Sequence, residues 1–290
     1  NVRNYFTTIN RQGAACFPSG TRRDCRGETS EAGLARQGRR LVEVIRALDA
    51  DIVGLVEVEN NGEMAVRELV DDLNAALGAR VYASVKMPAG GTGSDATRIA
   101  MIYRPDRLST VGGAVSDAGP AHARPPLAQT FAAANGRKIR VAAVHFKSRA
   151  GCPAASDRRR ASDADRGQGC WNQRRTRQAV SLVRFLNRDR IPTLIVGDLN
   201  AYGKEDPALA FTRNGFVDEV ARFNDFAYSY VFDGRSGYLD HALASPDLDR
   251  YVTGTAHWHI NADEPPTAGD GAYRSSDHDP VLVGIDFGRR

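Results

Sequence analysis

The chain lacks any apolar stretch long enough to cross a membrane, and it has no proline- or serine-rich linker and no internal repeat. We therefore expect no membrane insertion, and nothing divides the 290 residues into separate units. Its 42% hydrophobic and 26% charged residues are typical of a globular protein with a sizeable core. The sequence predicts a single domain spanning residues 1–290.

Cysteine is scarce, and none of the four cysteines stands in a C-x-x-C pattern or beside a histidine that would indicate a metal site. They fall as two local pairs, Cys16 with Cys25 and Cys152 with Cys170, each in a loop-like stretch. Four cysteines allow three connectivities, and we favour the local one because each pair brackets a single loop. Disulfides predict an oxidising compartment and hence a secreted or cell-surface protein. No signal peptide is visible, which fits a mature or trimmed chain.

Neither sign of charge dominates, because 39 basic and 35 acidic side chains give a net charge of +4 and only a weak bias toward polyanions. The charges cluster, however: residues 151–177 hold seven arginines and one tryptophan. One interpretation is a solvated loop whose aspartates offset part of the charge. The other is an arm that contacts phosphates, since arginine donates paired hydrogen bonds to phosphate oxygens. On the second interpretation the substrate-binding residues include Arg158, Arg159, Arg160 and Arg174.

Hydrophobic periodicity predicts helices over residues 28–50, 63–77 and 173–187, the first with Ser30 as its N-cap. Apolar runs predict strands over residues 51–60, 98–105, 138–148, 191–197 and 281–287. Helices that alternate with buried strands are typical of the α/β class. The glycine-rich segment 90–93 is expected to be a loop, because it lacks the lysine and hydroxyl residue of a P-loop.

Polar residues stand at the carboxyl ends of three expected strands. Asp198 and Asn200 end the most apolar run, and they share a face if the chain stays extended. That face would lie in the crevice where α/β sheets bind ligands. The alternative is a helix-capping aspartate with a turn asparagine. Another strand ends in Glu57 and Glu59, and a third ends in His145 and Lys147, again two residues apart.

An ordered set of short motifs runs through the whole chain: N-V-R-N-Y-F, D-I-V-G-L-V-E, R-I-A-M-I-Y-R-P, R-P-P-L-A-Q-T-F, H-F-K-S, G-D-L-N, L-D-H and S-S-D-H-D-P. In this combination the chain resembles the endonuclease/exonuclease/phosphatase superfamily typified by DNase I. The H-F-K-S and R-P-P-L-A-Q-T-F stretches and the two cysteine loops resemble its bacterial extracellular nucleases. The resemblance implies an α/β fold, a four-layer α/β/β/α sandwich, with the site at one edge of two packed sheets.

The resemblance also assigns residues. It implies metal binding by Glu57, Asp277 and Asn1, and catalytic roles for His278, Asp240, His145, Asp198 and Asn200. Substrate binding is expected to involve Arg124 and Lys147 together with the arginines of residues 151–177. The chain departs from the family pattern in two places. The strand ahead of Asn1 is missing, so we expect the natural chain to begin earlier, and no glutamate is found to partner His145.

The chemistry follows from these residue types. Mg²⁺ prefers a few carboxylate oxygens together with water and phosphate, which suits Glu57 with Asp277 or Asn1. A histidine held by a carboxylate, as expected for His278 and Asp240, can act as a general base. Asp198 would position the water or assist the leaving group, with Asn200 and His145 donating to phosphoryl oxygens.

We therefore expect a secreted nuclease that uses Mg²⁺, with Mn²⁺ or Ca²⁺ as alternatives, and that hydrolyses DNA, and RNA as a further substrate, endonucleolytically to 5′-phosphate ends. We expect a monomer. The sequence leaves open whether this domain is part of a larger chain with further domains. A phospholipid or inositol-phosphate phosphodiesterase on the same fold is the enzymatic alternative. A non-catalytic nucleic-acid-binding module would not need the acidic and histidine residues together.

Overall fold

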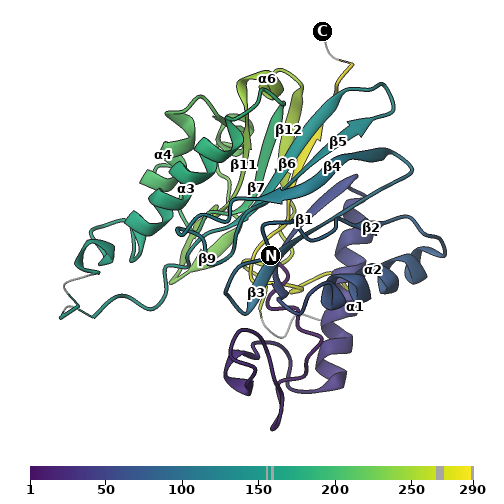
Figure 1. Ribbon diagram of the computed structural model, residues 1–290, viewed down its shortest axis with the longest axis vertical. Helices are drawn as coiled ribbons and strands as arrows, with labels where there is room; N and C mark the ends of the chain where they lie inside the picture. Colours follow the sequence, from purple (N-terminus) through teal and green to yellow (C-terminus); the bar gives the residue numbers. More distant parts are fainter. Residues whose placement is uncertain (155, 158–159, 266–270, 289–290) are drawn as a thin grey trace.

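The computed structural model describes residues 1–154, 156–157, 160–265 and 271–288 (Figure 1). Arg158 and Arg159, expected to bind substrate, lie outside these residues. The described helices are η1 (Arg22–Asp24), α1 (Glu31–Leu48), α2 (Met64–Leu77), η2 (Ala161–Asp163), α3 (Asn172–Leu186), α4 (Asp206–Thr212), α5 (Glu219–Phe223) and α6 (Pro246–Asp249), where η marks a 3-10 helix.

The described strands alternate with these helices along the chain. They are β1 (Ile52–Glu59), β2 (Ala83–Ser84), β3 (Thr97–Tyr103), β4 (Leu108–Ser116), β5 (Leu127–Ala133), β6 (Lys138–His145), β7 (Thr193–Asp198), β8 (Val217–Asp218), β9 (Tyr230–Phe232), β10 (Arg235–Gly237), β11 (Asp240–Ala244), β12 (Val252–His257) and β13 (Val281–Ile285).

The largest sheet has the strand order β4-β5-β6-β7-β11-β8. Within it β6 and β7 are parallel, and the other neighbouring strands are antiparallel. A second sheet has the order β1-β3-β2, while β12 pairs with β13 and β9 with β10 as two-stranded ribbons. The parallel pair is joined through α3, as a parallel connection requires, and it brings the carboxyl ends of β6 and β7 to the same edge.

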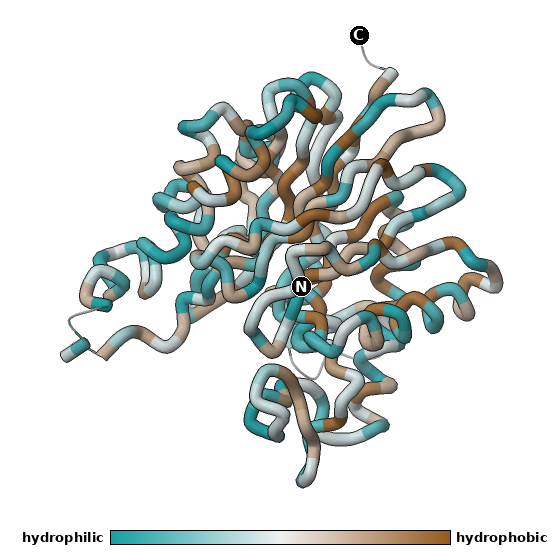
Figure 2. Tube along the Cα trace, viewed as in Figure 1, coloured by the Kyte–Doolittle hydropathy of each residue, from teal (hydrophilic) through white to brown (hydrophobic). Residues whose placement is uncertain are grey.

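Three apolar clusters separate four layers, as expected from the family resemblance. One lies where α1 and α2 cover β1 and β3, and one lies where α3 and α4 cover β6 and β7. The third, which includes Val56, Met101, Phe131 and Val141, fills the space between the two larger sheets. In Figure 1 the two helical layers lie on opposite sides of the strands, and in Figure 2 the brown, hydrophobic segments are concentrated on the central strands.

The expected elements are confirmed, with ends that differ by a few residues. The side chain of Ser30 accepts a hydrogen bond from the amide of Gly33, so it caps α1 as predicted. The apolar residues of α1 at helical spacing, such as Leu34, Leu41 and Ile45, are buried against the sheet. Short strands such as β2 and β8, and the β9-β10 ribbon, carry too little hydrophobic pattern to be predicted from the sequence.

Both expected disulfides are closed: Cys16 bonds Cys25 and Cys152 bonds Cys170, each with Cα atoms 5.2 Å apart. None of the helices in the described part of the chain has the length and apolar character that crossing a bilayer requires.

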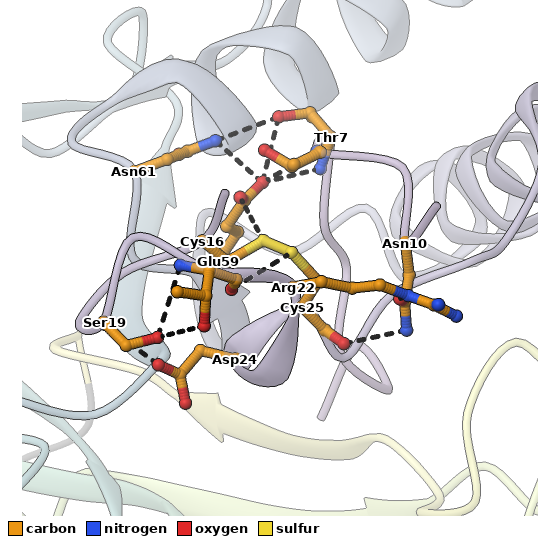
Figure 3. The surroundings of a disulfide bond; sticks show 11 residues. Thr7, Asn10, Cys16, Ser19, Arg22, Asp24, Cys25, Glu59 and Asn61 are labelled. Carbon is orange, nitrogen blue, oxygen red and sulfur yellow. Dashed lines mark hydrogen bonds between the residues drawn. A yellow bond between two sulfur atoms is a disulfide. The ribbon is translucent and has the colours of Figure 1, made fainter. Parts of the chain in front are cut away.

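The first disulfide packs against the end of β1 (Figure 3). One carboxylate oxygen of Glu59 accepts hydrogen bonds from the amides of Thr7 and Thr8 and from the side chain of Asn61, at 2.8–3.0 Å. The other oxygen lies 3.8 Å from the sulfur of Cys16. Glu59 therefore holds the first cysteine loop in place, and its role differs from that of Glu57 on the same strand.

An apolar cavity of about 630 Å³ extends between β1, β13 and α1. It is lined by Ile52, Val281 and Leu41 among others, and Asn1 and Asp240 are also part of its lining. Among the described residues the edge of β1 that faces away from β3 pairs with the N-terminal segment, through the parallel bridge between Tyr5 and Val58 and a hydrogen bond from the amide of Val2 to the carbonyl oxygen of Val56. β1 and β13 therefore flank this cavity and do not pair with each other.

Candidate active site

Three candidate residues stand in one row across three neighbouring strands. His145 ends β6 and lies in register with Asp198 of β7, which in turn lies in register with Asp240 of β11. Each of the three side chains is buried. The pairing of the strands, and not proximity in the sequence, therefore brings an imidazole and two carboxylates to one edge of the large sheet.

His278 completes this row from the segment that precedes β13. Its Nδ1 lies 2.7 Å from Oδ2 of Asp240, a distance typical of a charge-assisted hydrogen bond. Burial acts to lower the pKa of His278, but the carboxylates of Asp240, Asp198 and Asp277 outweigh it and raise that pKa. Burial likewise acts to raise the pKa of Asp240, but His278 lowers it overall. Asp240 and His278 therefore form an ionised pair at neutral pH.

His145 and Asp198 are farther apart, with Nε2 and Oδ2 separated by 3.6 Å. Burial, followed by the positive charge of Arg124, lowers the pKa of His145 well below its usual value. Burial also raises the pKa of Asp198, to about 7. Nδ1 of His145 is buried and has no hydrogen-bond partner among the described residues, in agreement with the missing glutamate partner. This second pair is therefore held close to neutrality.

Asn200 does not share a face with Asp198 by extension of the strand, as the sequence suggested, because β7 ends at Asp198 and Asn200 has a positive φ of 50°. A tight turn brings them together instead. The amide of Asn200 donates to Oδ1 of Asp198 at 2.6 Å, and its side-chain nitrogen donates to Oδ2 at 2.9 Å. Asn200 therefore orients the carboxyl group of Asp198.

Gly197 makes this strand exit possible. Its φ is +121°, and a Cβ atom built there would lie 2.4 Å from the carbonyl oxygen of Val144 on β6. Any other residue would both strain the backbone and push β6 away from β7. The glycine of the G-D-L-N motif is thus required for close packing of the two strands that carry His145 and Asp198.

Glu57 reaches the site through an irregularity in β1. The register between β1 and β3 shifts between Leu55 and Val58, and Glu57 has a φ of +70°, which is unusual for a residue with a side chain. Its carboxylate oxygens accept hydrogen bonds from Nδ2 of Asn1 at 3.0 Å and from the amide of Asn4 at 2.9 Å. The bulge gives Glu57 and Glu59 different surroundings, although the sequence placed them on one face.

The residues expected to hold a metal are linked by hydrogen bonds. Oδ1 of Asn1 lies 3.3 Å from the hydroxyl of Ser276, which lies 3.4 Å from Oδ1 of Asp277. Glu57 and Asp277 are both half-buried, and neither forms a salt bridge with a described residue. Two such carboxylates fit a divalent cation that keeps water and phosphate as further ligands.

Asn1 fits the ligand role less well than expected. Its carbonyl oxygen already accepts hydrogen bonds from the amide of Arg3 and the hydroxyl of Ser276, while its nitrogen holds Glu57. These contacts favour Asn1 as the residue that orients Glu57. Among the described residues no group of three histidine, cysteine, aspartate or glutamate side chains is arranged to hold a metal.

Arg124 lies beneath the row. Its guanidinium donates to the carbonyl oxygens of Phe146, at 2.6 Å, and His145, at 3.4 Å, and Nη1 lies 3.5 Å from Oδ2 of Asp95. Only 11% of the Arg124 side chain is exposed. In this structure Arg124 fixes the end of β6, and its positive charge adds to the burial that lowers the pKa of His145.

Lys147 does not share a face with His145, because β6 ends at His145. Its ammonium donates to the carbonyl oxygens of Ser148 and Ala150 and lies 5.1 Å from the ring centre of Trp171. Burial, followed by the charges of Arg124 and Arg174, lowers the pKa of Lys147 to about 8. Lys147 therefore stands at the base of the arginine-rich loop.

The arginines of that loop fall into two groups. Arg175 is buried and donates to the carbonyl oxygens of Cys170 and Gln168, so it is structural. Arg160 is 61% exposed and lies over the ring of Trp171. The guanidinium of Arg174 forms no hydrogen bond or salt bridge with another described side chain. Figure 1 shows the loop extending away from the body of the molecule.

Two site residues were missed by sequence reasoning. The hydroxyl of Ser229 donates to Oδ2 of Asp240 at 2.7 Å and accepts the amide of Asp240. The ring of Tyr230 lies against that of His278, with centroids 4.6 Å apart. The only sequence signal was the alternation of aromatic and small residues in F-A-Y-S-Y-V-F, which ends in the short strand β9.

Comparisons with known proteins agree with this architecture. A model of the Endonuclease/Exonuclease/phosphatase family matches residues 16–278. No curated protein sequence matches the chain. Among solved structures, a mannosyl-6-phosphatase of Bacteroides thetaiotaomicron is 17% identical with a TM-score of 0.61, and the alignment covers 88% of this chain and 92% of that one.

Two further structures show the same fold. The human Nocturnin catalytic domain with bound sulfate is 18% identical with a TM-score of 0.57, covering 88% of this chain and 86% of that one. D. rerio TDP2 in complex with a single-strand DNA product is 12% identical with a TM-score of 0.53, covering 87% of this chain and 92% of that one. At such identities these likenesses establish the fold alone.

Proposed function

The chain belongs to the endonuclease/exonuclease/phosphatase family, whose members hydrolyse phosphoester bonds, and from this premise we propose that it is a divalent-metal-dependent nuclease. Its substrate is DNA, with RNA as a further substrate, and cleavage is endonucleolytic with 5′-phosphate products. The observation that carries the proposal is the buried, ionised pair of His278 and Asp240, one residue from the half-buried carboxylate of Asp277.

Glu57 and Asp277 are the residues that would hold the cation, with Mg²⁺ as the first choice and Mn²⁺ or Ca²⁺ as alternatives. A bound divalent ion polarises a phosphoryl oxygen and offsets the negative charge of the phosphate. Asn1 and the amide of Asn4 hold the carboxylate of Glu57 in place. Once the charge of Asp277 is shared with a cation, Asp277 raises the pKa of His278 less.

His278 serves as the general base in its neutral form, which a cation beside Asp277 would favour by weakening the raised pKa of His278, and in that form it takes the proton of the attacking water. Asp240 holds Nδ1 and thereby leaves Nε2 as the nitrogen that faces the substrate, and its charge stabilises the imidazolium formed on proton uptake. Ser229 in turn fixes the carboxylate of Asp240. This chain of hydrogen bonds holds the base in one orientation before substrate arrives.

Asp198 acts on the opposite side of the phosphate. Because its pKa is raised, its carboxyl group retains a proton at or below about pH 7, and it can give that proton to the leaving oxygen. Asn200 holds the carboxyl group in place, and the neutral imidazole of His145 donates to a phosphoryl oxygen without competing for the proton. The arginine-rich loop supplies further phosphate contacts through Arg160 and Arg174, together with Arg158 and Arg159.

Two disulfides support a secreted or cell-surface location. The protein acts as one catalytic domain and as a monomer in this proposal.

The test is cleavage of supercoiled plasmid DNA with Mg²⁺ and with EDTA. We expect nicking only with the metal, loss of nicking in His278→Ala and Glu57→Gln, and 5′-phosphate ends on the products. His122→Gln is the matched control, because His122 is also buried and paired with an aspartate, Asp117, at 3.1 Å. Cleavage in EDTA, or cleavage by His278→Ala at the wild-type rate, would contradict the proposal. Hydrolysis of sphingomyelin without any action on DNA would favour the phospholipid alternative.

A further inference from the structure

The segment that leads into β9 carries aromatic residues at every second position, in the order Phe226, Tyr228, Tyr230 and Phe232. The chain turns at Phe226 and bends at Ser229, so within this segment strand alternation applies to Tyr230 and Phe232 of β9, which project to the same side. The hydroxyl of Ser229 is bonded to Asp240, and the ring of Tyr230 lies against that of His278. The segment therefore contacts the catalytic pair through Ser229 and Tyr230 and presents the ring of Phe232 to solvent.

Three rings form a ladder that runs from the catalytic histidine to solvent. The ring of Tyr230 lies against that of His278, with centroids 4.6 Å apart. The ring of Phe232 is nearly parallel to that of Tyr230, with an interplanar angle of 8° and centroids 6.4 Å apart. Exposure rises along the ladder, because His278 is buried, Tyr230 is half-buried and Phe232 is 66% exposed.

A second stack stands beside the ladder. The rings of Tyr228 and His259 lie 3.8 Å apart at an angle of 8°. Nδ1 of His259 is 2.8 Å from Oδ2 of Asp279, whose other oxygen accepts three backbone amides, from Ile260, Asn261 and Ala262. These contacts fix the orientation of the stack, so the aromatic side of this segment is preorganised.

The exposed ring of Phe232 leaves a flat apolar face at the end of the ladder, which another flat group can cover. Nucleobases are such groups, and stacking of an unpaired base on an aromatic side chain is sequence-tolerant because every base has a flat face. In a duplex the base faces are covered by their neighbours, so only a single strand, or a locally opened one, can use the ladder.

We propose that the ladder formed by His278, Tyr230 and Phe232 binds an unstacked base next to the scissile phosphate, and that the substrate of this site is single-stranded nucleic acid or a locally opened strand of a duplex. This inference rests on the proposed function, because it takes the phosphate beside His278 to be the one that is cleaved. The stacked base fixes the position of the strand relative to His278, and Phe232 acts as a specificity-determining residue without touching the reacting atoms.

A lipid surface is disfavoured as the occupant. Two of the rings that flank the site are tyrosines, and the rings stack in sequence toward a buried imidazole. Insertion into a membrane would instead require a tip of exposed aliphatic and aromatic residues that point away from the protein. The nearby loop with Arg160 and Arg174 fits a polyanionic strand.

The experiment compares Phe232→Ala with Phe226→Ala. Phe226 is 94% exposed, lies six residues away, and has no ring partner among the described residues, so it controls for the loss of an exposed phenylalanine. The probes are a fluorescent oligothymidylate, a strand of the same length without bases, a duplex, and phosphatidylcholine vesicles. Binding is measured in EDTA by anisotropy for the strands and by sedimentation for the vesicles, and KM and kcat are measured with Mg²⁺.

We expect the wild type to bind oligothymidylate more tightly than the base-free strand. Phe232→Ala should weaken binding of oligothymidylate, and raise its KM, by about tenfold, with little change in kcat or in binding of the base-free strand. Phe232→Trp should restore binding, and Phe226→Ala should behave as the wild type. The inference would be overturned if Phe232→Ala weakened binding of strands with and without bases equally, or if it left the Kd for oligothymidylate unchanged. A loss of binding confined to vesicles would overturn it as well. The binding measurement in EDTA does not depend on turnover. Absence of hydrolysis with Mg²⁺ would therefore contradict the proposed function without contradicting base stacking on Phe232.

Discussion

Two pairs of the same composition, His278 with Asp240 and His145 with Asp198, lie side by side at the edge of one sheet and differ in charge. In the first pair the attraction between opposite charges, together with a 2.7 Å hydrogen bond, overcomes burial and raises the pKa of the histidine and lowers that of the aspartate. In the second pair the atoms are 3.6 Å apart, and burial moves both pKa values toward the neutral forms.

The difference shows that burial alone does not decide the state of a histidine and an aspartate. All four side chains are buried, yet charge attraction supported by a direct hydrogen bond outweighs desolvation in one pair, whereas desolvation prevails in the other. Arg124 adds to the contrast, since its positive charge lies near His145 and disfavours a second cation there. The two pairs can therefore divide proton uptake and proton donation between them.

The largest effect is expected from the ionised pair. Asp240→Asn preserves shape but removes the charge that favours the imidazolium, so turnover on DNA should fall by at least about 10²-fold and as far as about 10⁴-fold, with little change in binding. His278→Ala should be at least as damaging. The double variant should be little worse than His278→Ala, because residues that act as a unit are not additive. Steady-state kinetics with Mg²⁺ checks this. If the losses of the two single variants simply multiply in the double variant, the two residues act independently.

A smaller loss is expected from the neutral pair. Asp198→Asn keeps the contacts of Asn200 in part but removes the proton for the leaving oxygen, so kcat should fall by about 10²-fold. A substrate whose leaving group needs no proton, such as a nitrophenyl phosphodiester, should be hydrolysed by Asp198→Asn at a rate closer to the wild type. An equal loss on both substrates would give Asp198 a role other than that of a general acid.

His145 should matter less than its partner. His145→Gln keeps a neutral hydrogen-bond donor at the end of β6, and we expect turnover to fall by about tenfold, within the range for the loss of one well-placed donor. The replacement also removes the imidazole whose Nε2 lies 3.6 Å from Oδ2 of Asp198. If His145 were instead a second charged base, His145→Gln would be as damaging as His278→Ala in the same kinetic assay.

The smallest effect concerns the arginine-rich loop. Arg174→Ala should weaken binding of DNA alike for all sequences and should flatten the slope of log affinity against log salt by about 0.7 to 0.9 for each lost phosphate contact. Arg188→Ala is the control, because Arg188 lies beyond the far end of α3 against Phe185. Equal slopes of log affinity against log salt for the wild type and Arg174→Ala would support the other interpretation, in which the loop is a solvated segment held by a disulfide.

Much of the fold and of the site's membership was within reach of the sequence. Through the family resemblance that they carry, the motifs around Glu57, Asp198, Asp240 and His278 implied the four layers and the residues that gather at one edge. The two disulfides followed from the spacing of the cysteines. Long apolar runs and local pairs are signals that a single sequence carries.

What the sequence could not supply was backbone geometry that breaks regular periodicity. Alternation along a strand placed Glu57 with Glu59, Asp198 with Asn200 and His145 with Lys147 on common faces. The bulge at Glu57, the turn at Asn200 and the end of β6 at His145 each changed that arrangement. The charge difference between the two histidines was also out of reach, because it depends on whether the histidine and aspartate side chains lie 2.7 Å or 3.6 Å apart.

The contrast between the two pairs is tested most directly by ¹³C NMR of the aspartate carboxyl groups across pH in the metal-free protein, with Asp198→Asn and Asp240→Asn used for assignment. Asp198 should titrate near pH 7, and Asp240 should remain ionised until the pH approaches about 2. Two carboxyl groups that titrate together near the usual aspartate value of about 3.9 would contradict the account, as would the reverse order.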